Sequence, residues 1–248
     1  MMLQSSISRP KEVVATYPRL KQPFRTKLFK QLHEKYGSLE CFAKVFSFSE
    51  LASSELGSWC SDILWKFALA EEEAHKAERK EERNLDAQPD SESLTKVEKD
   101  IHLLREAAEV VQGHEFPAPR LLECDLSMKV ILLWGYLSKV YREDTAGKCI
   151  IFVSRRYTAR VLGELFTQLG NPHLRLGVLV GARAGFVGDE NMTFRRQMTI
   201  VSQFRRGKLN CLIATSVAEE GLDIPDCSLV IRFVPSCHTR HSVVVAKD

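Results

Sequence analysis

The chain has 248 residues, of which 44% are hydrophobic and 27% charged, and its formal net charge is +3. This composition is typical of a soluble globular protein. No apolar run approaches the roughly 20 residues that a membrane-spanning helix needs, so the sequence predicts no membrane partner. The seven cysteines are odd in number and scattered along the chain. This favours reduced thiols in an intracellular protein, cytoplasmic or nuclear, over a disulfide framework.

The net charge is divided unevenly between the two halves. Residues 119–248 carry 18 Lys and Arg against 12 Asp and Glu, a balance of +6, whereas residues 1–118 carry 17 against 20, a balance of −3. The C-terminal half is therefore the better candidate for a polyanionic partner, but a charge of this size is a weak signal by itself.

Residues 1–115 predict a helical domain. Near the N-terminus an apolar stripe occupies one helical face: Phe24, Leu28, Leu32 and Tyr36. The segment around this stripe is basic. A basic helix can face a nucleic acid, but with no further support we prefer a solvated surface helix. A further amphipathic helix is predicted over residues 94–111. No strand pattern occurs before the Gly- and Pro-containing segment 113–119, where we place a domain boundary.

Between these helices, residues 66–83 are densely charged and rich in good helix formers. Such a run predicts an exposed helix that is supported by pairs of opposite charge four residues apart, for example Glu72 with Lys76. The pattern of residues 66–83 indicates no catalytic or binding site.

From residue 116 the pattern changes to helices that alternate with strands. The first is an amphipathic helix over residues 126–141. Apolar runs of strand length then alternate with helical segments: strands at 149–153, 174–180, 211–214 and 228–233, and helices at 160–170 and 193–206. This alternation indicates a parallel α/β sheet over residues 116–233.

The most informative stretch is residues 210–226, where a buried strand meets a polar loop. The apolar run ends at Thr215 and Ser216, and three carboxylates then surround Gly221. In an open parallel sheet, ligands bind just outside the carboxyl ends of the strands. Hydroxyls and carboxylates placed there therefore indicate a polar ligand. The plain alternative is a strand-to-loop junction with solvated acids.

Two other strand ends carry groups that suit a phosphate backbone. Ser154, Arg155 and Arg156 follow the first predicted strand and supply a hydroxyl donor and guanidinium groups. Gly181 follows the second strand and lets the main chain approach a phosphate closely, while Arg183 adds charge. The plain alternative for the second segment is a glycine-containing turn.

These motifs resemble those of a known family. The residues from Ile213 to Pro225 resemble motif V of the superfamily 2 helicases, in the form found in Dicer proteins and the RIG-I-like RNA sensors. Residues 148–156 resemble motif IV, and residues 148–233 follow the order and spacing of the second RecA-like lobe. The helical residues 1–115 stand where these proteins carry a helical insertion that grips double-stranded RNA. As a whole the sequence looks most like a fungal Dicer-like protein.

The resemblance implies a fold and a site. The fold is an incomplete RecA-like parallel sheet, residues 116–233, preceded by an all-helical insertion domain, residues 1–115, and followed by a divergent tail, residues 234–248. The implied RNA-backbone contacts are Ser154, Arg155, Arg156, Gly181, Arg183, Thr215 and Ser216. The residues implied on the nucleotide side are Glu220, Gly221 and Asp223. The implied parent activity is ATP-dependent action on double-stranded RNA in RNA silencing and antiviral defence, with ATP and Mg as cofactors and the first RecA-like lobe as a partner.

Several parts of a working motor do not occur in this sequence. It contains no Gly-x4-Gly-Lys-Ser/Thr phosphate loop, no Asp-Glu-x-His box, no Gln-x-x-Gly-Arg-x-x-Arg motif and no RNase III domain. We therefore assign no catalytic residue, and we expect this chain alone to bind nucleotide weakly and not to hydrolyse ATP. Cys227, Cys237, His238 and His241 do not have the spacing of a familiar zinc site, so no metal site is predicted.

Two alternative functions stay open at this point. One is a fragment of a RIG-I-like or other superfamily 2 helicase, which would use the same motifs for RNA sensing. The other is a non-enzymatic protein that binds RNA or a protein partner without ATP.

Overall fold

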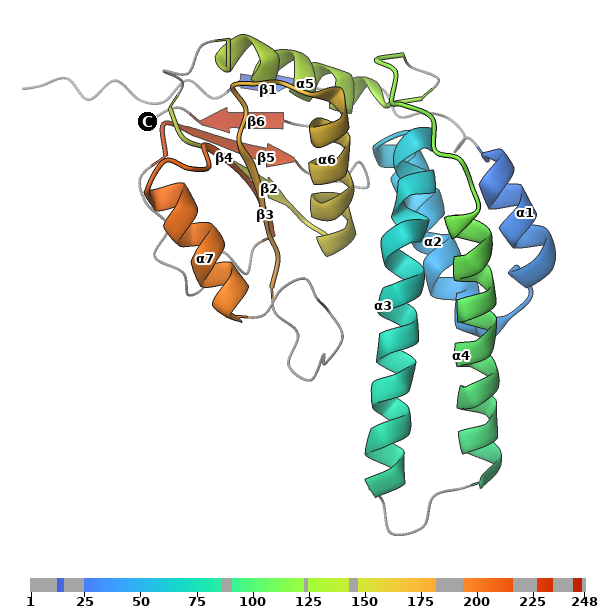
Figure 1. Cartoon of the computed structure of the whole chain (residues 1–248). Coiled ribbons are helices and arrows are strands. Elements are labelled where there is room, and N and C mark those ends of the chain that lie inside the picture. The colour runs from blue at the N-terminus through green and yellow to red at the C-terminus, as the bar shows by residue number, and fades with distance from the viewer. Residues whose placement is uncertain are drawn as a thin grey trace, which may run out of the picture.

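The computed structural model describes residues 13–15, 25–85, 91–122, 125–142, 147–181, 194–215, 227–233 and 243–246. These residues form a group of helices and a sheet that is covered by helices on both faces (Figure 1). In the chain, the two parts are separated by residues 113–122, which contain no helix or strand.

The helical part consists, among the described residues, of α1 (Lys27–Tyr36), α2 (Glu40–Glu55), α3 (Ser58–Leu85) and α4 (Ser91–Gln112). α3 and α4 run side by side as a long antiparallel pair, and α1 and α2 lie against the end of this pair that is opposite Leu85 (Figure 1). The core of this part is aromatic. Trp65 of α3 is fully buried, and its ring makes edge-on contacts with the rings of Phe29 and Phe46 at centroid distances of 6.5 and 5.0 Å.

The amphipathic helix that the sequence predicts near the N-terminus is confirmed as α1. Its apolar stripe is buried at Leu28, Leu32 and Tyr36. The helix begins after Thr26, whose hydroxyl oxygen accepts a hydrogen bond from the backbone N–H of Phe29 at 3.0 Å. The same hydroxyl donates to Oδ1 of Asp62 in α3 at 2.5 Å. The N-cap of α1 is therefore also its attachment to α3.

We expect Asp62→Asn to stabilise the protein at neutral pH. Burial raises the pKa of the Asp62 carboxyl from its ordinary 3.8 to about 6, opposed by the hydrogen bond from Thr26 and by His114. The neutral acid therefore favours folding below about pH 4, and this advantage is lost as the pH rises through 6. Asparagine keeps an acceptor for Thr26 without the buried charge. We expect a gain of about 1 kcal/mol in the free energy of unfolding at pH 7, allowing for solvent screening.

Urea unfolding at pH 7 and at pH 4 checks this expectation for Asp62→Asn. The gain should become much smaller at the lower pH, because the folded wild-type carboxyl, with its pKa of about 6, is then almost entirely neutral and no longer carries a buried charge. An equal gain at both pH values contradicts the assignment of the effect to the buried charge.

Charged residues of the long helices pair between helices. The expected pair of Glu72 with Lys76 along one helix is wrong. Lys76 instead binds Asp100 of α4 at 2.8 Å, and Glu72 binds Lys44 of α2 at 3.1 Å. Because α2 and α4 both pack on α3, they place opposite charges within reach, and spacing along the chain alone does not reveal them.

The second part of the molecule is built on a sheet with the strand order β1-β6-β5-β2-β4-β3. Its parallel strands are β2 (Cys149–Val153), β3 (Leu176–Leu179), β4 (Cys211–Thr215) and β5 (Leu229–Phe233). Helices α5 (Met128–Val140) and α6 (Arg156–Leu169) pack on one face of the sheet, and α7 (Phe194–Arg205) packs on the other (Figure 1). The predicted parallel α/β fold with a preceding helical region is confirmed.

Alternate residues of the strands belong to two separate layers of the core. In β4, Cys211 and Ile213 pack with the residues of α5 and α6, whereas Leu212 and Ala214 pack with those of α7. All the residues of β4 are buried. A strand that is covered on both faces needs this continuous apolar run, and the sequence shows it.

Two antiparallel strands extend the sheet at the edge opposite β3. β6 (Val243–Ala246) pairs with β5, and β1 (Val13–Ala15) pairs with β6. The sequence analysis predicts neither strand, since it places Val13–Ala15 in the helical domain and Val243–Ala246 in the divergent tail. Runs of three or four residues show too little periodicity to be recognised alone. They are strands because they pair with each other and with β5.

The two parts of the molecule are joined at the turn between α2 and α3. The backbone N–H of Ser127 donates to the carbonyl of Leu56 at 2.8 Å, and the N–H of Trp59 donates to the carbonyl of Asp125 at 3.1 Å. Gly57 lies between these bonds with a φ of 114°. α6 also packs against α3. The start of α5 is therefore held directly by the helical part.

Candidate nucleic-acid interface

The parallel strands end together at one edge of the sheet, which we call the carboxyl edge. Val153, the last residue of β2, lies opposite both Thr215, the last of β4, and Phe233, the last of β5. Leu179 at the end of β3 lies opposite Ala214. Residues that follow these strands are therefore neighbours in space, at the edge where open parallel sheets bind ligands.

The residues after β2 are accessible on this edge. Ser154 and Arg155 are exposed, and Arg156, the first residue of α6, is partly buried. The guanidinium carbon of Arg155 lies 5.9 Å from the centre of the Phe48 ring of α2. The neighbouring Tyr157 ring is 5.1 Å from the same ring. A hydroxyl and two guanidinium groups therefore stand at the start of α6, where the helix dipole also favours an anion.

Thr215 is a buried polar residue at the end of β4. It is only 5% exposed, and its hydroxyl makes no hydrogen bond within the described part of the chain. A buried hydroxyl without a partner costs roughly 1–3 kcal/mol. Such a group calls for an explanation, and a bound ligand is one.

β3 reaches the same edge at Gly181, two residues beyond its end. Gly181 is buried. The carbonyl of Val180 before it accepts a hydrogen bond from Nε2 of Gln197 at 2.8 Å. Because Gln197 is in the first turn of α7, this bond holds the start of α7 against the end of β3. The structure thus brings three of the expected site residues to one edge: Ser154, Gly181 and Thr215.

The other expected site residues fall into two groups. Arg155 and Arg156 lie at the same edge through their position after Ser154. The remaining ones lie outside the described residues and stay predictions: Arg183, Ser216, Glu220, Gly221 and Asp223.

A buried lysine that the sequence analysis does not select also lies at the carboxyl edge. Lys129, near the start of α5, is 5% exposed, and its Nζ is 3.8 Å from the centre of the Phe233 ring. Burial lowers the pKa of Lys129 to about 8, and Glu55 at the end of α2 opposes this shift. The cation therefore links the helical part, α5 and the end of β5. In the sequence it reads as an ordinary surface lysine on an amphipathic helix.

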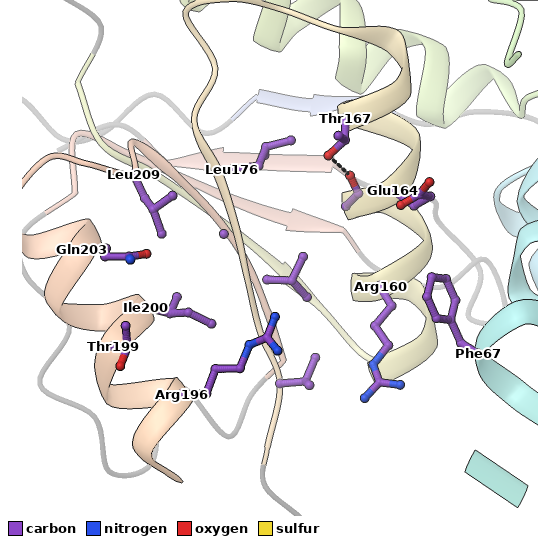
Figure 2. A pocket seen from close by; sticks show the side chains of 14 residues that line it. Phe67, Arg160, Glu164, Thr167, Leu176, Arg196, Thr199, Ile200, Gln203 and Leu209 are labelled. Carbon is purple, nitrogen blue, oxygen red and sulfur yellow. Dashed lines mark hydrogen bonds between the residues drawn. The ribbon is translucent and has the colours of Figure 1, made fainter. Parts of the chain in front are cut away.

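Two further arginines, Arg160 and Arg196, line a groove of about 560 Å³ beside this edge. The groove lies between α6, β3 and α7, and the two side chains enter it from opposite sides (Figure 2). The sequence analysis does not select them, because each stands in a helix. Their signal is one of position: helices that follow parallel strands begin at the carboxyl edge, and both arginines lie within the first two turns of such helices.

No metal site is found in the part of the chain that the structure describes, where no three His, Cys, Asp or Glu side chains could hold an ion together. The five described cysteines form no disulfide bond with one another: Cys41, Cys60, Cys149, Cys211 and Cys227. Cys237, His238 and His241 lie outside the described residues. Within the described residues, no helix has the length and apolar character to cross a membrane.

Comparison with known proteins supports the fold and the motifs. Residues 130–244 match the model of the helicase conserved C-terminal domain. Over 232 residues, 94% of the chain, the sequence is 47% identical to Dicer-like protein 1 of Neosartorya fischeri and 46% identical to that of Aspergillus clavatus. Dicer-like protein 1 of Cryphonectria parasitica is 40% identical over 234 residues. The chain carries a helicase C-terminal domain of the Dicer-like type. It spans 15% of the length of each of these relatives.

This Dicer-like chain is also similar to parts of solved helicases. The Pyrococcus furiosus Hef helicase domain is 21% identical, with a TM-score of 0.35, and the match covers 82% of this chain and 37% of that one. The C-terminal domain of the DEAD-box protein Dbp5 is 29% identical, with a TM-score of 0.30 over 39% of this chain and 47% of that one. Because both TM-scores are below 0.5, the assignment rests on the sequence matches.

The comparisons confirm the Dicer-like resemblance that the motifs carry. The matched helicase domain runs to residue 244 and thus reaches into β6 of this Dicer-like chain. Part of the segment that the sequence analysis treats as a divergent tail therefore falls within the matched helicase domain.

Proposed function

We propose that this Dicer-like chain contributes RNA-backbone contacts to an ATP-dependent helicase that acts on double-stranded RNA in RNA silencing and antiviral defence, in the cytoplasm or nucleus. The supporting observation is the meeting of Ser154, Gly181 and Thr215 at the carboxyl edge of a helicase C-terminal domain. Contacts to a phosphodiester backbone require hydroxyl and N–H donors and positive charge, without reading base edges. These residues, with Arg155 beside them, supply such groups.

In this proposal the RNA backbone follows the carboxyl edge across three strands. Across the sheet, the contacts come from the ends of β2 (Ser154, Arg155 and Arg156), β4 (Thr215 and Ser216) and β3 (Gly181 and Arg183). Residues 1–115 act as the insertion domain that holds the double strand. The contact of Phe48 with Arg155 and Tyr157 supports a direct link between that domain and the RNA-binding edge.

Nucleotide chemistry belongs to the complete parent protein. ATP with Mg would lie between this lobe and the first RecA-like lobe, with Glu220, Gly221 and Asp223 on this side. Since these three lie outside the described residues, no observed geometry tests their fit to the nucleotide, and we assign no step of phosphate transfer to this chain.

The proposal predicts opposite effects of Thr215→Val on RNA binding and on stability. Valine keeps the shape of the side chain but removes the hydroxyl, which has no partner among the described residues. We expect the affinity for double-stranded RNA of about 30 base pairs to fall roughly tenfold, because a hydrogen bond to a charged phosphate is lost. The free energy of unfolding should stay equal or rise by up to about 1 kcal/mol. Fluorescence anisotropy titrations and urea unfolding measure the two quantities.

Ser228→Ala is the control for Thr215→Val. It removes a hydroxyl just before β5, at the amino end of the strands and away from the carboxyl edge, where it donates to the Lys148 carbonyl at 3.0 Å. RNA affinity should be unchanged in this variant. If the wild-type chain shows no salt-dependent binding to double-stranded RNA, the proposed function is wrong. If the wild-type chain binds RNA and Thr215→Val binds it with the same affinity, Thr215 is not a contact residue.

A further inference from the structure

The groove beside the carboxyl edge follows an open edge of the sheet. β3 is the last strand in the sheet order, and within the described residues it pairs with β4 alone. On the other side, Leu176, Gly177 and Val178 of β3 line the groove together with Val180 and side chains of α6 and α7 (Figure 2). Phe67 of α3 adds a wall from the helical part.

The walls of the groove are held at a close and fixed spacing. A Cβ on Gly163 of α6 would lie 2.5 Å from Cγ2 of Val178, so the helix packs on β3 as closely as a glycine allows. On the other face, a Cβ on Gly177 would lie 2.7 Å from Cδ1 of Leu209. The bond from Gln197 to the carbonyl of Val180 then holds the start of α7. The groove is therefore a preformed feature of the lobe.

Positive charge gathers at the end of the groove that meets the carboxyl edge. Arg160 stands in the second turn of α6, and Arg196 is the third residue of α7. Figure 2 shows the Arg196 side chain extending from α7 toward β3, and the Arg160 side chain on the α6 side of that strand. Arg196 is exposed and Arg160 partly buried. Farther from this edge the lining changes to Glu164 and to uncharged side chains.

We propose that Arg160 and Arg196 form a phosphate clamp that carries the RNA backbone from the carboxyl edge onto the open edge of β3. The clamp rests on the proposed function, since the same backbone must first reach Gly181. Each of the two guanidinium groups can bind a phosphate, because each offers paired donors to phosphate oxygens. The placement of both charges at one end favours a backbone that arrives from that edge over an acidic peptide lying along the whole strand.

The test is the salt dependence of RNA binding by the full chain. Arg160→Gln with Arg196→Gln removes two phosphate contacts, so the slope of log K against log salt should become shallower by about 1.4 to 1.8. The affinity at moderate salt should fall roughly 5- to 20-fold. Arg206→Gln is the matched control: Arg206 is exposed just beyond the other end of α7, about 15 Å from Arg196 along the helix axis. That distance exceeds the Debye length at physiological salt, so its slope should equal the wild-type slope.

The possible outcomes separate the clamp from the proposed function. If the wild-type chain binds RNA and the double variant keeps its slope, the clamp is wrong and the proposed function stands. If the wild-type chain binds no RNA, both fall. Normal RNA binding with lost binding of poly-glutamate would mark the groove as a protein-docking edge and overturn the clamp. Should the double variant fail to fold, the exposed Arg196→Gln alone must still lower the slope by about 0.7 to 0.9.

Discussion

Gly57→Ala is expected to cost at least about 3 kcal/mol of the free energy of unfolding. Gly57 has a φ of 114°, a conformation that residues with a side chain rarely adopt. An added Cβ would lie 2.4 Å from the carbonyl oxygen of Asp125 and 2.5 Å from the Cα of Leu126. Both are backbone atoms, which cannot rotate away as a flexible side chain can.

Gly57→Ala should mainly destabilise the junction between the helical part and the part built on the sheet. To relieve the clash, the turn between α2 and α3 must move away from residues 125–127. That movement breaks the backbone hydrogen bonds from Ser127 to Leu56 and from Trp59 to Asp125. Hydrogen exchange should therefore show faster exchange at the N–H groups of Ser127 and Trp59.

Gly113→Ala provides the matched comparison. A Cβ on Gly113 would lie 3.6 Å from the carbonyl oxygen of Glu109, an ordinary contact. Its effect should stay within about 0.5 kcal/mol in either direction. Urea unfolding of both variants gives the two values, and a similar small effect for Gly57→Ala would contradict the packing of this turn against residues 125–127.

Trp65→Ala should be comparably damaging, with a loss of about 3 to 5 kcal/mol. Trp65 is the largest of the fully buried side chains among the described residues. Its removal leaves a cavity between the rings of Phe29 and Phe46, which pack against it. α1 and α2 lose their common contact with α3, and the helical signal in circular dichroism should fall at a lower urea concentration.

Comparison of Trp65→Phe with Trp65→Ala distinguishes the effect of the cavity from the effect of the buried Nε1–H group. The Nε1 of Trp65 has no hydrogen-bond partner among the described residues. Phenylalanine removes that buried N–H while it keeps part of the ring, so we expect a smaller loss of roughly 1 to 2 kcal/mol. A loss for Trp65→Phe as large as that for Trp65→Ala would show that Nε1 is bonded in solution.

The sequence by itself determined the parallel lobe and the common edge of its site. The central strands β2 and β4 are continuous apolar runs because they are covered on both faces, and that pattern is local. Once the strands are parallel, chain direction alone sends Ser154, Gly181 and Thr215 to one edge. The helicase motifs could be read for the same reason, since their residues are contiguous in the chain.

Only the tertiary structure decided the contacts that join residues far apart in the sequence. β1 and β6 are too short to be recognised and exist as strands through pairing across the length of the chain. Lys76 pairs with Asp100 and not with Glu72 because α4 packs beside α3. Lys129 is buried because α5, β5 and the end of α2 converge on it. Arg160 and Arg196 meet only because α6 and α7 flank the same open strand. None of these contacts repeats with a helical or strand period, so no local pattern in the sequence reveals them.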